Sequence, residues 1–422
     1  MAKFKPTNIK GANDLYSGTM FLKTDIVNKL EQSFRSYGYM PLETAKLNYL
    51  ETLSHKYDEG AEIVREIYKI KDQGERDLGL RYDLTVPFCK FIAMNRNLKM
   101  PFRRFEIGKV WRNGPVKAGR VREFYQCDID VVGDKSIAVE AEMIAMAVDI
   151  YKRLGIEPVI EYGNRKMLTQ IILDAGVAEN KVESVIGIVD KMKKITRQEL
   201  EAELGKIIAK PQLDKLLKGF ENPKKIDEII ELERLLELHR VSGNCVFAPH
   251  LARGLNIYTG TVWEVFDKAK RIASSLGGGG RYDKIITEWI DNGLEYPAVG
   301  MSFGLEPIMK VLETEMKSEE MSNVNLMIVP MVENHLIVEF TKKLRDEGIS
   351  VLTWNDGRVG KAMEYADKGR IPFVVIIGEK EITSEKISVK NMRDGKSVEF
   401  GIKDAEKIRN TIRQEIWLCE RK

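Results

Sequence analysis

Arginine and aromatic residues surround a turn near residue 114 in a pattern that suits nucleotide binding. Arg112 precedes the turn Asn113-Gly114-Pro115, and Arg120 and Phe124 follow it. A guanidinium group pairs with two phosphate oxygens at once, and a phenyl ring offers a face on which a base stacks. The pattern predicts a hairpin that holds a triphosphate, although a charged hairpin in solvent is an equally good interpretation of these residues alone.

Two further stretches have residue types that ligand binding requires. Arg253 lies between apolar residues, and a buried guanidinium group needs an anion. A structural salt bridge is the first interpretation of Arg253 alone, and an anionic ligand is the second. Gly277–Gly280 would let backbone approach a ligand, but no Gly-Lys-Ser/Thr follows, so this is not a Walker loop. A flexible loop is the competing interpretation of the glycines.

Asp83 and Thr85 are separated by one residue, which would place both side chains on one face of a strand. A carboxylate and a hydroxyl group at that spacing could hold an ammonium group. Asp and Thr are also common in turns and helix caps, and that is the preferred interpretation of the pair by itself.

The elements that must position these residues indicate an α+β fold. Strand-like stretches are joined by short turns rather than by helices, which favours an antiparallel sheet with helices on one face over a doubly wound parallel sheet. These stretches are 67–70, 78–82, 102–111 and 123–132. Leu22, Ile26, Leu30 and Phe34 recur at steps of four and predict an amphipathic helix before Gly38.

Changes in residue pattern and composition along the chain predict three parts. Residues 1–165 and 241–316 would form the core, and the helical, lysine-rich stretch 166–240 would be inserted into it. After a polar linker at 317–322, residues 323–422 alternate strands and helices, which predicts a separate α/β domain with a parallel βαβαβ unit and a hairpin.

Composition narrows the class of protein. The chain of 422 residues is long enough for two or three domains. A net charge of only +3 gives no overall attraction for nucleic acid, so an RNA site would need a local basic patch. There is no signal peptide or long apolar span, so we expect a cytoplasmic protein without membrane contact. The scattered cysteines and histidines predict no protein-built metal site.

The stretches named above occur together in the order and spacing of one family. The chain resembles histidyl-tRNA synthetases from near residue 9 to near residue 416. One such motif arises easily by chance, but the whole ordered set does not. The matching stretches are 11–15 with the helix up to Pro41 (motif 1 of class II synthetases), 80–88, 112–130 (motif 2), 253–260 (the histidine-specific signature), 279–283 and 299–306 (motif 3).

The resemblance implies an enzyme that activates histidine with ATP and transfers it to the 3′ end of tRNA(His). It implies a class II antiparallel core, a C-terminal anticodon-binding domain, a homodimer formed through motif 1, and Mg²⁺ carried on the triphosphate oxygens. Asp83, Thr85 and Gln126 would bind the α-ammonium group, and Asp130, Tyr258 and Tyr282 would line the imidazole pocket. The ATP site would comprise Arg112, Arg120, Phe124 and Glu306. Arg253 and Arg112 would be catalytic, with Arg253 stabilising charge on the α-phosphate.

Three positions depart from the family's commonest pattern. Pro307 stands where motif 3 usually has an arginine that covers the adenine, and motif 2 lacks its usual acidic residue. Asn256 and Ile257 replace Asp and Tyr in the histidine signature. Two departures fall on the adenine side, where Arg281 or Lys310 would be the nearest substitutes for the missing cation.

Two alternatives remain at this point. A non-catalytic paralogue, such as the histidine-sensing regulatory subunit of ATP phosphoribosyltransferase, would bind histidine without activating it. Arg112, Arg120, Arg253 and the complete C-terminal domain argue against it. A class II synthetase for another amino acid is the second alternative, and Asp130 with Tyr258 argues against that. Production of histidyl-adenylate separates the alternatives.

Overall fold

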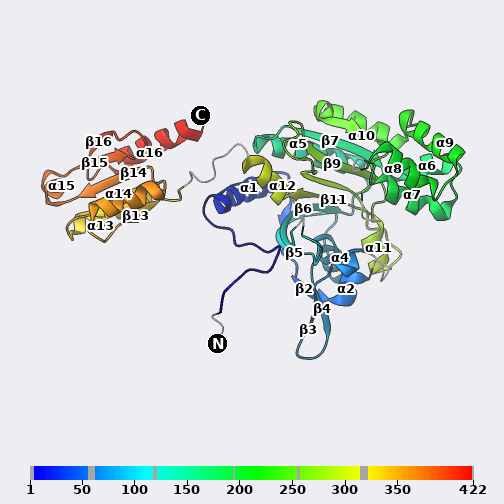
Figure 1. Ribbon diagram of the computed structural model, residues 1–422, viewed down its shortest axis with the longest axis horizontal. Coiled ribbons are helices and arrows are strands. Elements are labelled where there is room, and N and C mark those ends of the chain that lie inside the picture. The colour runs from blue at the N-terminus through cyan, green and yellow to red at the C-terminus, as the bar shows by residue number, and fades with distance from the viewer. Residues whose placement is uncertain are drawn as a thin grey trace. The chain divides into compact units, whose positions relative to one another are not determined.

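The computed structural model describes residues 4–55, 62–116, 121–192, 195–253, 257–313 and 322–420. The chain divides into two units, residues 1–14 with 23–315 and residues 15–22 with 316–422. Each unit has its own sheet (Figure 1). None of the helices in these ranges is long and apolar enough to cross a membrane.

An eight-stranded sheet forms the centre of the first unit, in the order β1-β5-β6-β11-β10-β9-β7-β8. Its inner pairs are antiparallel, and only the outer strands β1 and β8 pair in parallel. The predicted antiparallel sheet is therefore confirmed. The strands are β1 (Met40–Pro41), β5 (Phe102–Trp111), β6 (Glu123–Val132), β7 (Pro158–Asn164), β8 (Cys245–Phe247), β9 (Thr261–Asp267), β10 (Gly277–Arg281) and β11 (Ala298–Gly304).

The two faces of this sheet are covered differently, and the expectation of helices on one face only was wrong. Phe303 on one face packs against Phe34 of α1 (Ser17–Ser36) and Tyr151 of α5 (Ile137–Arg153). On the opposite face, Arg104 lies against Phe88 of α4 (Thr85–Met94), which packs with α11 (Lys284–Ile290). We refer to this second face, which contains Asp130, as the site face.

The four consecutive glycines form strand β10 rather than a loop. Gly277–Gly280 pair with β9 on one side and β11 on the other. Without side chains, a strand in the middle of a sheet leaves both of its faces open to close approach. The glycines therefore create room on the site face while remaining part of the rigid sheet.

A small sheet, in the order β2-β4-β3, lies in the same unit as the large one. It comprises β2 (Leu47–Tyr49), β3 (Lys69–Lys71) and β4 (Asp77–Leu80), with α2 (Leu50–Ser54) and α3 (Glu62–Arg65) nearby in sequence. The helices α6 (Arg165–Asp174), α7 (Val182–Val189), α8 (Arg197–Gly205), α9 (Lys210–Glu221) and α10 (Asp227–Leu238) follow β7, and α12 (Leu305–Glu313) follows β11. Figure 1 shows α6–α9 as a group at one end of this unit and α10 beside α5.

The second unit has the predicted βαβαβ pattern followed by a hairpin. Its sheet order is β13-β12-β14-β15-β16, with the first three strands parallel. The additional short helix α15 (Glu379–Ser384) was not expected. The other elements are β12 (Leu326–Pro330), α13 (His335–Asp346), β13 (Val351–Thr353), α14 (Val359–Lys368), β14 (Phe373–Ile377), β15 (Lys386–Asn391), β16 (Ser397–Gly401) and α16 (Ala405–Glu420).

Candidate active site

Strand β6 places three polar side chains on the site face. Gln126, Asp128 and Asp130 alternate along the strand, so they share one side of the sheet. On the neighbouring strand β11 their cross-strand partners are Gly304, Ser302 and Gly300. A Cβ atom on Gly300 would collide with the Asp130 carboxylate, so this glycine makes room for the acid.

Asp130 is the centre of a buried polar group. Its carboxylate accepts a hydrogen bond from the Tyr282 hydroxyl, and its Oδ2 lies 2.7 Å from Nη2 of Arg104. Burial raises the pKa of Asp130, while the Arg104 guanidinium opposes that rise. The structure thus brings the predicted residues Asp130 and Tyr282 together with the buried Arg104, to which the sequence analysis assigned no role in histidine binding.

Asp83 and Thr85 do not lie on a strand, so that expectation was wrong. β4 ends at Leu80, and Thr85 is the first residue of α4. Oδ1 of Asp83 accepts a hydrogen bond from the backbone nitrogen of Val86 at 3.0 Å, in the first turn of α4, which agrees with the turn or cap preferred for this pair by itself. Burial also raises the pKa of Asp83 to about 6, against the opposing charges of Arg112 and Arg104. Asp83 therefore accepts a hydrogen bond from the first turn of α4 and lies near the site arginines.

Arg112 and Phe124 meet at the end of the β5–β6 hairpin. The guanidinium carbon of Arg112 lies 5.0 Å from the centre of the Phe124 ring, and its Nε donates to the Tyr82 carbonyl at 3.1 Å. Glu306 at the start of α12 accepts a hydrogen bond from the Tyr125 backbone nitrogen at 2.8 Å. Arg120 lies outside the described residues. The described part of the predicted ATP site is thus assembled from the hairpin and the motif 3 helix.

The glycine strand supports Arg253 and Tyr258. A Cβ atom on Gly278 would lie 2.6 Å from Nη1 of Arg253, and one on Gly280 would lie 2.7 Å from the Tyr258 ring. Nη1 of Arg253 is 3.5 Å from the Trp263 carbonyl, and among the described residues no carboxylate forms an ion pair with this arginine. The salt bridge first considered for Arg253 is therefore absent from the described part of the chain. Asn256 lies outside that part, and Ile257 is buried in the core beside Tyr282.

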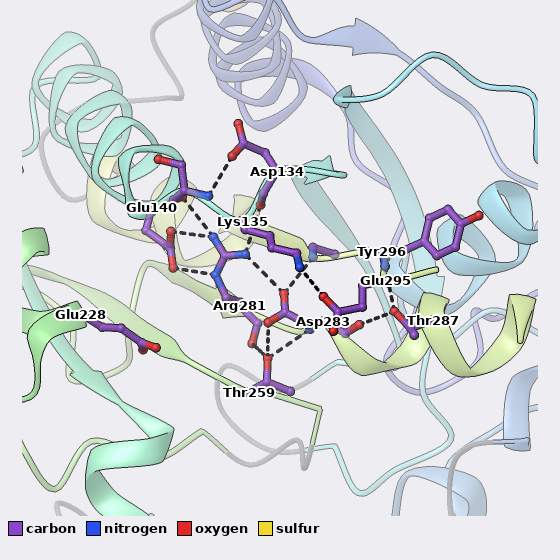
Figure 2. A network of polar contacts seen from close by, with 12 residues as sticks. Asp134, Lys135, Glu140, Glu228, Thr259, Arg281, Asp283, Thr287, Glu295 and Tyr296 are labelled. Atoms are coloured by element: carbon purple, nitrogen blue, oxygen red, sulfur yellow. Dashed lines mark hydrogen bonds and ion pairs between the residues drawn. The ribbon is translucent and has the colours of Figure 1, made fainter. Parts of the chain in front are cut away.

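The Arg281 side chain is held by the carboxylates of Glu140 and Asp283 and does not point into the site. Figure 2 shows its guanidinium group held by Glu140 of α5, with Asp283 and Thr259 beside it. Nε and Nη2 donate to the two Glu140 oxygens at 2.8 Å each, and Thr259 Oγ1 donates to Asp283 at 3.1 Å. Arg281 thus ties α5 to the segment that contains Tyr258. It cannot replace the arginine missing at Pro307, whereas Lys310 is exposed on α12.

A second buried ion pair supports the hairpin from within. Arg81 and Glu106 are nearly inaccessible, and Nη1 of Arg81 lies 2.6 Å from Glu106 Oε1. Thr44 donates to Glu106 from both its backbone nitrogen and its hydroxyl, each at 3.0 Å. Sequence reasoning missed this pair together with Arg104 and Asp128. The two-residue alternation on β5 and β6 was a signal that could have placed Arg104, Glu106 and Asp128 on the face of Asp130.

Comparison with known proteins identifies the family once this geometry is known. A family model described as histidyl-tRNA synthetase matches residues 11–308, and one described as an anticodon binding domain matches residues 325–411. The chain belongs to the histidyl-tRNA synthetase family. The curated histidine–tRNA ligase 1 of Bacillus cereus is 40% identical over 416 residues, covering 94% of this chain and 97% of the relative.

Solved structures agree with membership of the histidyl-tRNA synthetase family. The histidyl-tRNA synthetase of Nostoc has a TM-score of 0.82 at 27% identity, covering 97% of this chain and all of that chain. A Bacillus halodurans protein titled as an ATP phosphoribosyltransferase regulatory subunit/histidyl-tRNA synthetase has a TM-score of 0.69 at 20% identity, covering 89% of this chain and 99% of that chain. At that identity the second likeness shows the shared fold alone.

Proposed function

We propose that the site face activates histidine with ATP to histidyl-adenylate and that the chain then transfers histidine to the 3′ end of tRNA(His). Family membership implies an ATP-dependent aminoacyl-tRNA ligase. The observation that carries the proposal is Arg253. It lies against Gly278 on the face that contains Asp130, without a carboxylate ion-pair partner among the described residues. A partly exposed guanidinium group without a carboxylate partner is available to an anion, and the α-phosphate of ATP supplies one.

On the nucleotide side, Arg112 would contact the α-phosphate and Arg120 the outer phosphates. Phe124 would stack on the adenine, after the Arg112 guanidinium moves from the ring face that it now approaches. Glu306 would complete the ATP site by accepting the hydrogen bond from the Tyr125 backbone nitrogen, which positions that part of β6. Arg253 would stabilise the charge that builds on the α-phosphate while the histidine carboxylate attacks in line.

On the amino-acid side, Asp83, Thr85 and Gln126 would receive the α-ammonium group. Asp130 and Tyr258 would face the two nitrogens of the imidazole, with Tyr282 fixing Asp130 through its hydroxyl. A neutral imidazole offers one donor and one acceptor. An apolar amino acid would leave these buried polar groups unpaired, which is the physical basis of selection.

Mg²⁺ would arrive with ATP and be bound through the phosphate oxygens. Among the described residues no cluster of three or more His, Cys, Asp or Glu side chains could hold a metal ion. Mg²⁺ usually keeps several waters and needs only one or two carboxylates besides phosphate. Each buried carboxylate of the site already lies near an arginine, which leaves too little negative charge for a resident divalent metal ion.

The proposal extends to organisation and location. Residues 1–165 with 241–316 would form the catalytic core, 166–240 an insertion that contacts tRNA, and 323–422 the anticodon-binding domain. We place the enzyme in the cytoplasm as a homodimer formed through motif 1. The regulatory-subunit alternative is not favoured, since the curated relatives are named ligases and the site arginines Arg112 and Arg253 are both present.

The decisive experiment is ATP–pyrophosphate exchange by the purified chain, with each of the twenty amino acids tested separately. We expect exchange with histidine alone, followed by charging of tRNA(His) but not of a non-cognate tRNA. Binding of histidine without exchange would instead support a histidine-sensing paralogue. Exchange with a different amino acid would contradict the assignment of the pocket to imidazole.

Replacing Pro307 by arginine is expected to strengthen ATP binding. Pro307 follows Glu306 on α12, and its ring lies 3.1 Å from the position of a Cβ on Gly304, which belongs to the site face. A cation over the adenine is worth about 0.5–2 kcal/mol, so the KM for ATP should fall about 2- to 30-fold. The ATP dependence of exchange at saturating histidine measures this change. Pro307→Ala is the control, and an unchanged KM in Pro307→Arg would place position 307 away from the adenine.

A further inference from the structure

Asp128 is a buried carboxyl group on the site face that the roles above do not use. It lies between Gln126 and Asp130 on β6 and is only 4% exposed. Its Oδ1 has no hydrogen-bond partner within the described structure, and the same holds for Oε1 of Gln126 and Nε of Arg104. Buried polar atoms in proteins are nearly always paired. Three unpaired groups on neighbouring strands therefore indicate that a polar ligand completes the arrangement.

The charges around Asp128 show which kind of ligand fits. Arg104 and Glu106 face Asp128 from β5, and Ser302 faces it from β11. Asp130 and the Gln126 amide lie beside it on β6. Asp83, which precedes α4, and the Tyr258 hydroxyl also lie near it. Arg81 pairs with Glu106, so Arg104 is the buried cation that faces Asp128 and Asp130, while Arg112 and Arg104 both act on Asp83; three aspartates thus face two arginines. Burial and the neighbouring acids raise the pKa of Asp128 to about 7. A further cation entering this group would relieve the excess of acids.

We infer that Asp128 is a further amino-acid-binding residue whose carboxylate accepts a hydrogen bond from the α-ammonium group of histidine. This inference rests on the proposed function. The ammonium group is favoured over the imidazole because Asp128 Oδ2 lies 3.5 Å from Nε2 of Gln126, the side chain assigned to the ammonium group. The ammonium group also carries a full charge and three donors, whereas a neutral imidazole has one donor.

Binding should then displace a proton from Asp128. Near pH 7 the unliganded carboxyl group is partly protonated, and the incoming ammonium group favours its ionised form. Histidine binding should therefore release a fraction of a proton from Asp128 and strengthen as pH rises through about 7. Histidine itself titrates in this range, so the informative quantity is the difference between wild type and Asp128→Asn.

Isothermal titration calorimetry with L-histidine, in two buffers of different ionisation enthalpy at pH 7, tests this inference. Asp128→Asn should bind histidine about 10- to 100-fold more weakly, because one charge-assisted hydrogen bond is lost. It should also lose the proton release seen in wild type. Asp128→Ser should behave alike, and both variants should fold, since the carboxyl group is already partly neutral. Asp214→Asn on the exposed side of α9 is the matched control and should bind like wild type.

Each other outcome has a definite meaning. Unchanged histidine affinity in Asp128→Asn would overturn the inference while leaving the proposed function intact. Weaker binding with the same proton release as wild type would also overturn it, because the carboxyl group would then act only through the structure. A wild-type chain that binds no histidine would overturn the proposed function itself, and this inference with it.

Discussion

Replacing Arg253 by alanine is expected to lower histidine-dependent ATP–pyrophosphate exchange about 10²–10³-fold, which is the effect of removing one preorganised group that stabilises transition-state charge. Arg253 lies against Gly278, and its guanidinium group contacts the Trp263 carbonyl and the Tyr258 ring, so it is positioned on the site face before ATP arrives. The loss should appear mainly in kcat, because the interaction strengthens as charge builds on the α-phosphate. Exchange kinetics at varied ATP and histidine concentrations separate kcat from KM.

The matched control for this variant is Arg197→Ala. Arg197 begins α8, and its side chain is 72% exposed in an ion pair with Glu201. We expect exchange by this control to equal that of wild type. Arg253→Lys keeps the charge but loses the planar fork, so it should recover only part of the activity. Full exchange by Arg253→Ala would contradict the assigned role, whereas raised KM values with unchanged kcat would make Arg253 a binding residue only.

Replacing Arg81 by leucine is expected to destabilise the first unit by about 3–5 kcal/mol, because it leaves Glu106 buried without its principal cation. Arg81 and Glu106 are each about 1% exposed, and Arg104 approaches Glu106 only to 3.7 Å. Arg81 also donates to the Lys109 and Thr44 carbonyls at 2.9 Å, and these acceptors would lose a partner. Urea denaturation followed by circular dichroism measures the change in the free energy of unfolding.

Two further variants test the cause of this loss. The double variant Arg81→Leu/Glu106→Leu should be more stable than Arg81→Leu alone, because it removes the uncompensated carboxylate. Arg76→Leu breaks an exposed pair with Asp72 and should change stability little. If Arg81→Leu were as stable as wild type, the pair would not hold the hairpin. If the double variant were the less stable of the two, lost packing rather than buried charge would be the cause.

Much of the fold could be predicted because its signals are local in the sequence. The apolar residues Leu22, Ile26, Leu30 and Phe34 recur at helical spacing, and all four are buried in α1. The strands Phe102–Trp111 and Glu123–Val132 were predicted with the bounds that they have in the structure. Alternation of short strands and helices likewise predicted the second unit. Each of these patterns reflects one element burying one side, which neighbouring residues reveal.

The misassigned stretches are those whose conformation depends on distant partners. Gly277–Gly280 has the composition of a loop, but hydrogen bonds to β9 and β11 make it a strand. Thr85 follows a strand-like stretch, yet it begins α4, where Asp83 accepts a hydrogen bond from the Val86 backbone nitrogen in the first turn. Arg281 resembled a free cation near the adenine, and Glu140, 141 residues earlier in the chain, holds it instead. Tertiary contacts override local preference at such positions.

The sequence by itself determined the antiparallel α+β class and the residues of the histidine and ATP signatures, because strand periodicity and motif spacing are properties of neighbouring residues. Only the tertiary structure decided which charges meet. Asp83, Arg104, Asp128 and Asp130 come from three segments. Burial raises the pKa values of the three aspartates, whereas burial opposes and the neighbouring acids cause the raised pKa of Arg104. Electrostatic energy depends on the distance between charges and on their exclusion from water. Spacing along the sequence gives neither quantity, so the balance of charges on the site face could be read only from the tertiary structure.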